Sequence, residues 1–247
     1  MKVLATYNIK GGVGKTATAV NLSYLAARDG LRVLLADLDP QAAATYTLRV
    51  RPRVKGGGKA LITGSRELDA AIKGTDFGNL DLLPADFTFR NLDLMLDATK
   101  KPTQRLARLL RPLRASYDLV FLDCPPGISL LSESVLHAAD LALVPIIPTT
   151  LSLRTLDQLT EFISDFDGPR PEVLAFSSMI DRRKRLHKEI AERLPAERKD
   201  VADTAIPALS IIEQMAVQRA PVAAFAPRSA AARAYAQLWA EVRDRLF

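Results

Sequence analysis

The sequence has little of what several classes of protein require. It contains one cysteine, Cys124, and two histidines among 247 residues. One cysteine cannot form a disulfide within the chain or hold an iron–sulfur cluster, so we expect a reducing compartment and no such cluster. His137 and His187 are isolated and lack metal-ligand spacing, which favours ordinary surface or helix positions. We expect Cys124 to be a small buried hydrophobe rather than a nucleophile.

Long apolar segments are also missing. No apolar run is long enough to cross a bilayer. Asn8 and Lys10 interrupt the N-terminal run, so we expect no signal peptide there. Hydrophobic residues make up 48% of the chain and charged residues 25%, which is typical of a soluble globular protein. The length suits one large domain, and we expect a single domain over residues 1–247.

Positive charge is in excess. The formal net charge is +6, which suggests an anionic partner such as nucleic acid, anionic lipid or nucleotide, or simply charge that keeps the chain soluble. We find no internal repeat. The one biased stretch, residues 49–59, is rich in arginine, lysine and glycine and is predicted to be a mobile basic loop.

Apolar runs alternate with helical patterns along the chain, which predicts an α/β fold with a doubly wound, mostly parallel sheet flanked by helices. The predicted strands are Val3–Tyr7, Arg32–Asp37, Leu80–Leu83, Leu119–Asp123, Leu141–Ile146 and Val173–Ser178, with a shorter one at Thr204–Ile206. The predicted helices are Thr18–Asp29, Thr103–Leu113, Leu151–Phe166 and Ala230–Leu246. In the last helix, Trp239 shares a helical face with Leu238, Val242 and Leu246, and we expect this face to pack on the core.

A glycine-rich loop follows the first predicted strand and leads into a helix. Its residues are Lys10, Gly11, Gly12, Val13, Gly14, Lys15 and Thr16. Glycines let backbone N–H groups converge on phosphate oxygens, and the helix N-terminus adds partial positive charge. In this motif the lysine, here Lys15, reaches the β- and γ-phosphates, and the Thr16 hydroxyl holds Mg²⁺. An ordinary P-loop would have glycine at position 9, where this chain has Ile9 followed by a second lysine.

Carboxylates end two other predicted strands. Asp37 and Asp39 lie at the end of the second strand, and Asp123 ends the apolar run of residues 119–122. Open α/β sheets bind ligands at the carboxyl ends of their strands, so these side chains are expected beside the phosphate loop. A carboxylate there can orient the attacking water or hold a water of the Mg²⁺ shell. Asp123 has the pattern of a Walker B aspartate.

The loop of residues 10–16 resembles the deviant Walker A loop of the ParA/MinD ATPases. Asp-Leu-Asp-Pro-Gln at residues 37–41 is similar to their switch I, and Asp-Cys-Pro-Pro at residues 123–126 to their switch II. The resemblance implies that Lys10 reaches across a dimer interface to the nucleotide of the other subunit. It further implies that Asp39 positions the hydrolytic water, that Asp37 lies nearer the metal, and that ATP and Mg²⁺ are the cofactors.

The resemblance extends loosely over the C-terminal half. Met179 and Asp181 follow a strand where ParA proteins contact adenine, and Pro207 matches their adenine-side pattern. Two departures stand out. Ala17 takes the place of a second threonine after Thr16, which leaves the ATP affinity in doubt. Ala42 and Ala43 replace the usual Gly-Asn after switch I.

Basic residues cluster after the sixth predicted strand. ParA proteins carry basic residues in this half that bind DNA without sequence preference, and such binding depends on phosphate contacts and on salt. We therefore predict nonspecific DNA binding, with a solvated helix face as the simpler reading. The candidate contacts are Arg182, Arg183, Arg185, Lys188, Arg219 and Arg228. We expect no sequence-specific operator binding, because the phosphate loop begins at once and leaves no room for a helix-turn-helix region before it.

The sequence thus predicts an ATPase that forms a homodimer with ATP, binds DNA and positions a cargo through an adaptor similar to ParB. The expected location is the cytoplasm, in association with the nucleoid. One alternative is a membrane-cycling ATPase similar to MinD, which would need an amphipathic tail beyond the last helix. We see no such tail and expect no membrane partner. The other is a metabolic ATP-dependent synthetase, which would need a dedicated substrate pocket.

Overall fold

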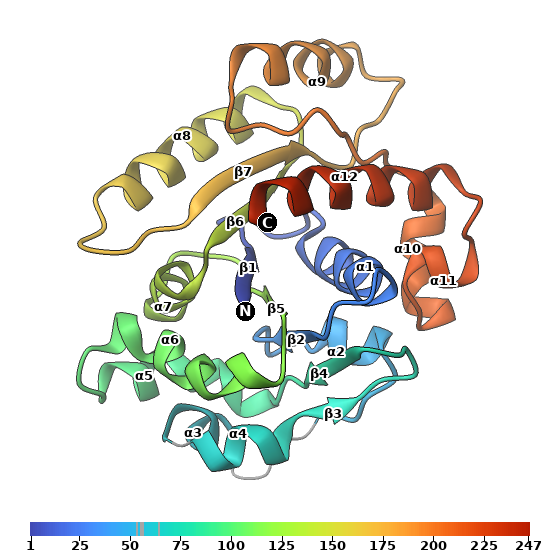
Figure 1. Cartoon of the computed structure of the whole chain (residues 1–247). Coiled ribbons are helices and arrows are strands. Elements are labelled where there is room, and N and C mark those ends of the chain that lie inside the picture. The colour runs from blue at the N-terminus through green and yellow to red at the C-terminus, as the bar shows by residue number, and fades with distance from the viewer. Residues whose placement is uncertain (53, 55–56, 64) are drawn as a thin grey trace.

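The computed structural model of the chain describes residues 1–52, 54, 57–63 and 65–247 (Figure 1). A seven-stranded sheet forms its centre, in the order β3-β4-β2-β5-β1-β6-β7. The strands are β1 (Lys2–Thr6), β2 (Val33–Asp37), β3 (Lys73–Gly74), β4 (Leu80–Leu83), β5 (Leu119–Asp123), β6 (Leu141–Ile146) and β7 (Glu172–Ser177). All neighbouring strands are parallel except the short edge pair of β3 and β4. This arrangement confirms the predicted fold class.

Helices cover both faces of the sheet, which explains why the strands are nearly continuous apolar runs. Every residue of β2, β5 and β6 is buried, as expected for parallel strands enclosed between two helical layers. The α-helices are α1 (Lys15–Arg28), α2 (Ala43–Thr47), α3 (Gly57–Thr63), α4 (Ser65–Ala71), α5 (Leu92–Asp97), α6 (Arg105–Leu110), α7 (Leu130–Ala138), α8 (Thr150–Ser164), α9 (Arg185–Glu197), α10 (Ser210–Gln218), α11 (Val222–Phe225) and α12 (Ala230–Leu246). The 3-10 helices are η1 (Phe87–Asn91), η2 (Pro102–Gln104) and η3 (Arg111–Ala115).

The core has two parts, one on each face of the sheet. Helices α1, α10, α11 and α12 bury their apolar residues in one part, and helices α5 to α9 contribute to the other. In Figure 1, α9 lies at one end of the molecule, beyond α8 and α12, and α3 and α4 lie at the opposite end.

The last helix closes one core layer. Its residues Leu238, Trp239, Val242 and Leu246 are all buried, and the indole N–H of Trp239 donates to Asp29 at 2.7 Å. The predicted packing of this face is therefore confirmed, and its apolar stripe is used within the fold. The predicted burial of Cys124 is confirmed too.

The register of the sheet aligns the carboxyl ends of β1, β2 and β5. Asp123 at the end of β5 is aligned with Asp37 of β2 on one side and with Thr6 of β1 on the other. The loop after β1 and the segment after β2 therefore leave the sheet together, at its carboxyl edge. This is the edge where the predicted phosphate-binding and carboxylate residues were expected to meet.

Two predictions of local structure were wrong. Thr204–Ile206 is not a strand, although Ile206 donates its N–H to the carbonyl of Ser177 beside it. The single helix predicted at residues 103–113 is divided into η2, α6 and η3, because Pro112 lacks an N–H and cannot continue an α-helix. The sequence reading also did not identify the antiparallel strand β3 or helix α9.

The predicted basic loop of residues 49–59 is only partly described. Residues 53, 55 and 56 lie outside the described residues, and α3 begins at Gly57, so the end of this stretch is helical rather than a loop. Among the helices that the structure describes, none combines the length and the apolar character needed to span a membrane.

Candidate functional site

The phosphate loop connects β1 to α1 and needs glycine at two positions. Gly12 has φ 69° and Gly14 has φ 94°, a left-handed conformation that a side chain disfavours. A Cβ on Gly14 would also lie 3.0 Å from the Ser178 hydroxyl. Gly11 and Gly12 are exposed while Val13 is buried. The loop is therefore anchored by Val13 and presents its backbone to solvent at the N-terminus of a long helix, where an anion is favoured.

The two lysines of this loop are placed differently. Lys15 is buried, and its Nζ donates to the carbonyl of Lys10 at 3.0 Å across the loop. Burial lowers the pKa of Lys15, while the negative charges of Asp123, Cys124 and Asp39 act in the opposite direction. The side chain of Lys10 is half-buried and has no bonding partner among the described residues. One lysine therefore serves its own loop, and the other is free to reach elsewhere.

Asp37 and Asp123 form a buried acidic pair at the carboxyl edge of the sheet. Burial raises the pKa of Asp37 to about 6, against the hydrogen bonds it accepts from Thr45 and Asp39. Burial, and then the charge of Asp37, raises the pKa of Asp123 well above its usual range. Two enclosed carboxylates that resist ionisation together make this edge a place where positive charge is strongly favoured.

The carboxylate oxygens of Asp37 and Asp123 differ in the hydrogen bonds that they accept. Both oxygens of Asp37 accept hydrogen bonds, Oδ2 from the N–H and hydroxyl of Thr45 and Oδ1 from the N–H of Asp39. Asp123 Oδ2 is buried and has no partner in the described part of the chain. The Thr16 hydroxyl lies close enough to Asp123 to lower its pKa. An unpaired carboxylate oxygen beside a hydroxyl suits Mg²⁺, which binds few protein oxygens and keeps several waters.

No larger metal cluster exists in the described residues: no group of three or more His, Cys, Asp or Glu side chains is suited to hold an ion. Mg²⁺ with phosphate and water ligands does not require one. Among the predicted metal residues, Asp123 offers an unpaired buried oxygen and Thr16 lies beside it. Asp37 holds the turn through Thr45, and its Oδ1, which accepts one bond at 3.3 Å, keeps a lone pair for a metal-bound water.

Asp39 lies on the turn after β2. Its Oδ1 accepts the N–H of Gln41 at 2.9 Å, and its carbonyl accepts the N–H of Ala42 at 2.9 Å. Ala42 adopts a left-handed conformation with φ 56° and precedes α2. Because Thr45 of α2 is bonded to Asp37, the turn is held at both ends. The second carboxylate oxygen of Asp39 has no partner in the described part of the chain, which leaves it available to a water molecule.

A buried tyrosine ties the phosphate loop to the segment after β5. The Tyr7 hydroxyl donates to the Gly127 carbonyl at 2.9 Å, and the Gly127 N–H donates to the Ile9 carbonyl at 3.0 Å. Burial raises the pKa of Tyr7 to about 12, so the hydroxyl keeps its proton and remains a donor. The sequence offered no signal for this contact, because a tyrosine in an apolar strand is ordinary.

The predicted adenine residues come together at the end of β7. The Ser178 hydroxyl donates to the Val13 carbonyl at 2.9 Å, which joins this region to the phosphate loop. Ile180 then pairs with Pro207: its N–H donates to Ile206 and its carbonyl accepts from Ala208, both at 3.0 Å. A cavity of about 330 Å³ lies here. Its lining residues are Ile180, Asp181, Arg182, Arg183, Pro207, Ala208, Leu209 and Ala230. The third predicted residue, Met179, does not line it but precedes Ile180 with φ 53°.

The predicted DNA-binding residues occupy more than one place. Arg182 and Arg183 lie on the turn between β7 and α9, and Arg183 pairs there with Asp181. Arg185 and Lys188 lie on α9, and Arg185 pairs there with Glu189. Arg228 precedes α12. Arg219 is elsewhere, and its guanidinium lies 4.6 Å from the Tyr46 ring centre and donates to the Tyr46 carbonyl. Arg219 thus ties the end of α10 to α2.

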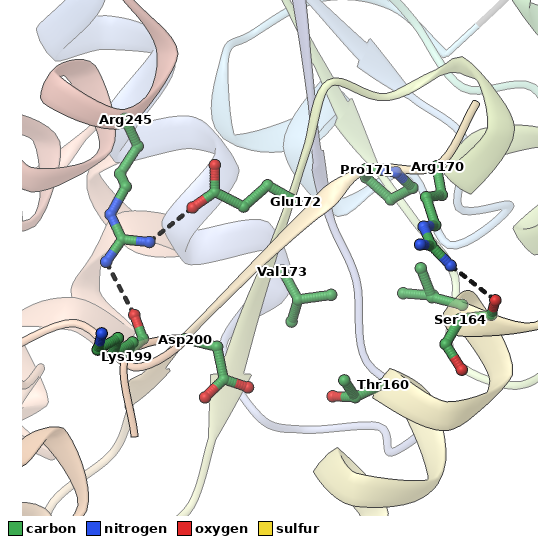
Figure 2. A pocket seen from close by; sticks show the side chains of 10 residues that line it. Thr160, Ser164, Arg170, Pro171, Glu172, Val173, Lys199, Asp200 and Arg245 are labelled. Carbon is green, nitrogen blue, oxygen red and sulfur yellow. Dashed lines mark hydrogen bonds and ion pairs between the residues drawn. The ribbon is translucent and has the colours of Figure 1, made fainter. Parts of the chain in front are cut away.

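A separate cavity lies at the opposite end of β7, between α8 and α12 (Figure 2). It has a volume of about 410 Å³, and no predicted site residue lines it. Arg245 donates there to the Glu172 carboxylate at 2.6 Å and to the Lys199 carbonyl at 2.9 Å, and Arg170 donates to the Ser164 carbonyl at 2.7 Å. Because these bonds join neighbouring elements at the amino end of the strand, we regard this cavity as a junction of the fold.

Comparisons with known proteins place the chain in a family. A family described as an AAA domain matches residues 1–173. The chromosome partitioning protein ParA of Caulobacter vibrioides is 34% identical over 99% of this chain and 95% of its own length. The sporulation initiation inhibitor protein Soj of Bacillus subtilis is 32% identical over 98% of both chains.

A solved structure of a synthase also has a similar fold. Cobyrinic acid a,c-diamide synthase of Mycobacterium smegmatis, with a bound ATP analogue and magnesium, has a TM-score of 0.83 and 28% identity. The match covers 98% of this chain and 94% of that one.

Proposed function

Because the chain belongs to the AAA domain family of ParA/MinD P-loop ATPases, we propose that it binds and hydrolyses ATP and that ATP joins two copies into a dimer. Residues 1–247 would act as one ATPase domain. The observation that carries this proposal is the contrast between the two loop lysines. Lys15 is buried within its own loop, and the Lys10 side chain has no bonding partner among the described residues. A second copy bound through the nucleotide would supply that partner.

Each residue of the site has a role in this account. The backbone of residues 10–17 would surround the phosphates, and Lys15 would pair with the β- and γ-phosphates. Thr16 and Asp123 would hold Mg²⁺, which supplies neutralising charge on the phosphates. Asp37 keeps the turn after β2 in place through Thr45. Asp39 would orient the attacking water with its free oxygen, and the side chains and backbone of Met179, Asp181 and Pro207 would hold the base.

The physiological role that fits best is cargo positioning on DNA. The net charge of +6 and the basic residues around α9 support binding to phosphate backbones without sequence preference. In this proposal the ATP-bound dimer binds the nucleoid in the cytoplasm, and an adaptor similar to ParB on the cargo stimulates hydrolysis and releases the dimer. The relatives named as partitioning proteins support this role.

Membrane cycling is less well supported. A helix that binds a membrane surface needs an exposed apolar face, and the apolar face of α12 is buried against the core. Phe247 is exposed, but one aromatic side chain provides little area. We therefore favour DNA over lipid as the anionic surface.

An amide-forming synthetase is the second candidate, because a structural neighbour with 28% identity carries that name. Such an enzyme would turn over ATP only with an acid substrate and an amine donor. Steady turnover of ATP by the purified chain without either would contradict the synthetase.

Dimerisation tests the proposal directly. Sedimentation with a non-hydrolysable ATP analogue should show a dimer for the wild type and a monomer with ADP. Lys10→Ala should remain largely monomeric with the analogue while the monomer binds ATP within about twofold of the wild type. Lys100→Ala, an exposed lysine between α5 and η2, serves as the matched control. Equal dimer fractions for Lys10→Ala and the wild type would contradict the role of Lys10 across the interface.

A further inference from the structure

We propose that His187 is a positioning residue for the base-binding turn and that it thereby sets the preference for adenine over guanine. This inference rests on the proposed function, because it assumes that the cavity beside Ile180 and Pro207 receives the base. His187 lies in the first turns of α9, is 5% exposed, and has no part in the chemistry at the phosphates.

The turn is fixed at its beginning by the neighbouring segment. Ile180 is bonded on both sides to residues 206 and 208, and Ser178 is bonded to the phosphate loop. These bonds hold the turn up to Ile180. The next residue, Asp181, also lines the cavity, and it needs a different support.

His187 supplies that support. The Asp181 N–H donates to His187 Nδ1 at 3.2 Å. In this bond the ring nitrogen Nδ1 is the acceptor for a backbone N–H. The Asp181 carboxylate binds Arg183, and its carbonyl accepts from Lys184. Among the described residues, the histidine therefore makes the bond that ties Asp181 to the buried side of α9.

Base selectivity is sensitive to this bond. Adenine and guanine differ at one edge of the purine. Adenine presents an amino group and an unprotonated ring nitrogen there, and guanine presents a carbonyl and an N–H. Groups that read this edge discriminate only when they are held in a fixed place, because a site with rigid polar groups rejects the wrong partner by leaving those groups unpaired. Without the His187 acceptor, the turn after Ile180 is free to adjust to either base.

The bond also places the base next to the basic residues. The same ten residues, 178–187, contact the phosphate loop, line the cavity and carry Arg182, Arg183 and Arg185. A change at His187 is thus expected to act on base recognition first and to leave phosphate binding intact.

The test compares three variants of the full-length protein. His187→Asn keeps an acceptor oxygen at the position of Nδ1. His187→Gln keeps a polar side chain of similar size but moves its amide towards the position of Nε2. His187→Leu removes the acceptor altogether. His137→Leu is the matched control, because His137 lies on α7, away from the base cavity, where it contacts the Pro169 carbonyl at 3.3 Å and stacks on Phe166.

Dissociation constants for ATP, GTP and inorganic tripolyphosphate are measured by calorimetry, and folding is checked by thermal melting. We expect His187→Gln and His187→Leu to lose about 5- to 20-fold in ATP affinity, because binding must then also order a turn that the wild type already holds in place. GTP and tripolyphosphate should change less than about twofold by the same reasoning, so the ratio of ATP to GTP affinity falls. His187→Asn and His137→Leu should keep the wild-type ratio.

Two results would overturn the inference. One is a wild-type ratio of ATP to GTP affinity in a folded His187→Gln or His187→Leu variant. The other is a wild type that binds both nucleotides equally. A wild type that binds tripolyphosphate and neither nucleotide would overturn the base site itself, and one that binds none of the three would instead refute the proposed ATPase.

Discussion

The phosphate side and the base side of the proposed nucleotide site are built in different ways. On the phosphate side, Asp37 and Asp123 are buried at the ends of central strands, Lys15 is buried at the start of α1, and Asp123 interacts electrostatically with both. On the base side, the cavity is formed by a turn and a crossing segment near the edge strand β7, held by a few backbone bonds and His187. The comparison teaches that the chemistry is fixed by the sheet, while base recognition depends on contacts between distant segments.

The largest expected effect concerns the phosphate side alone. Lys15→Ala removes the buried ammonium that faces Asp123 and the loop carbonyl, and ATP affinity should fall about 100-fold or more. Nucleotide titration by calorimetry measures this, with Lys100→Ala as the surface control. Unchanged ATP affinity in Lys15→Ala would show that the glycine loop is not the phosphate site. The proposed division into a phosphate side and a base side would then be wrong.

On the phosphate side, ATP hydrolysis should be separable from ATP binding. Asp39→Ala removes the free carboxylate oxygen after β2 but leaves the phosphate loop and Lys15 intact. We expect turnover to fall about 100-fold or more, the usual contribution of a group that positions or activates a nucleophile, with ATP affinity within about twofold. A phosphate-release assay tests this, and Asp97→Ala on α5 is the control. If Asp39→Ala turns over ATP at the wild-type rate, the water must be positioned by another residue.

A third change targets the basic residues of the turn after β7 and the start of α9. Because Arg182 and Arg183 also line the base cavity, ATP binding by the variant is measured alongside DNA binding. Replacing Arg182, Arg183 and Arg185 by glutamate should weaken DNA binding of every sequence alike and lower the salt slope by about one unit for each lost phosphate contact. The matched control replaces Arg108, Arg111 and Arg114 on α6 and η3, which gives the same change of charge at another part of the molecule. Equal losses in both triple variants would mean that overall charge, rather than the face near α9, governs DNA binding.

The smallest effect concerns stability. Because the pKa of Asp123 is raised in the folded protein, ionising it disfavours the fold, and stability is lost as pH rises through the raised value. Asp123→Asn without nucleotide should therefore melt about 3–6 °C above the wild type at pH 8, a difference of about 1–2 kcal/mol. The gain should shrink as the pH is lowered from 8 and Asp123 takes up its proton. Thermal melts across this range test it, with Asp97→Asn as control, and a gain independent of pH would contradict the buried charge.

The same variant distinguishes stability from function. Mg²⁺ with ATP should raise the melting temperature of the wild type more than that of Asp123→Asn, because an amide is a poorer magnesium ligand than a carboxylate. Equal stabilisation of both proteins by Mg²⁺ and ATP would remove Asp123 from the metal site.

Much of the phosphate side could be predicted because its signals are local. Residues 10–16 are contiguous, and Asp37 and Asp123 each end an apolar strand, so the parallel sheet brings them level although they are 86 positions apart. The strands at residues 80–83, 119–123 and 141–146 were predicted with the observed bounds. Burial on both faces makes such strands unmistakable as apolar runs.

The base side could be predicted only in outline. The resemblance pointed to Met179, Asp181 and Pro207, but no local pattern places His187 under Asp181 or Ser178 against Val13, since these contacts depend on how α9 and β7 pack. Helix α9 was missed although its buried residues, His187, Ile190 and Leu194, have helical spacing; Pro195 lies within it, and a proline in the sequence argues against a helix interior. The predicted strand at residues 204–206 was wrong because residues 201 and 207 make only isolated bridges.

The central claim, that ATP turns this chain into a DNA-binding dimer, is tested most directly by parallel DNA-shift and liposome-flotation assays on the wild type. We predict that the ATP-bound protein binds two DNA duplexes of unrelated sequence with similar affinity, that the ADP form binds both poorly, and that anionic liposomes are bound weakly in either state. Tight ATP-dependent binding to liposomes without binding to DNA would contradict the account and favour a membrane-cycling ATPase.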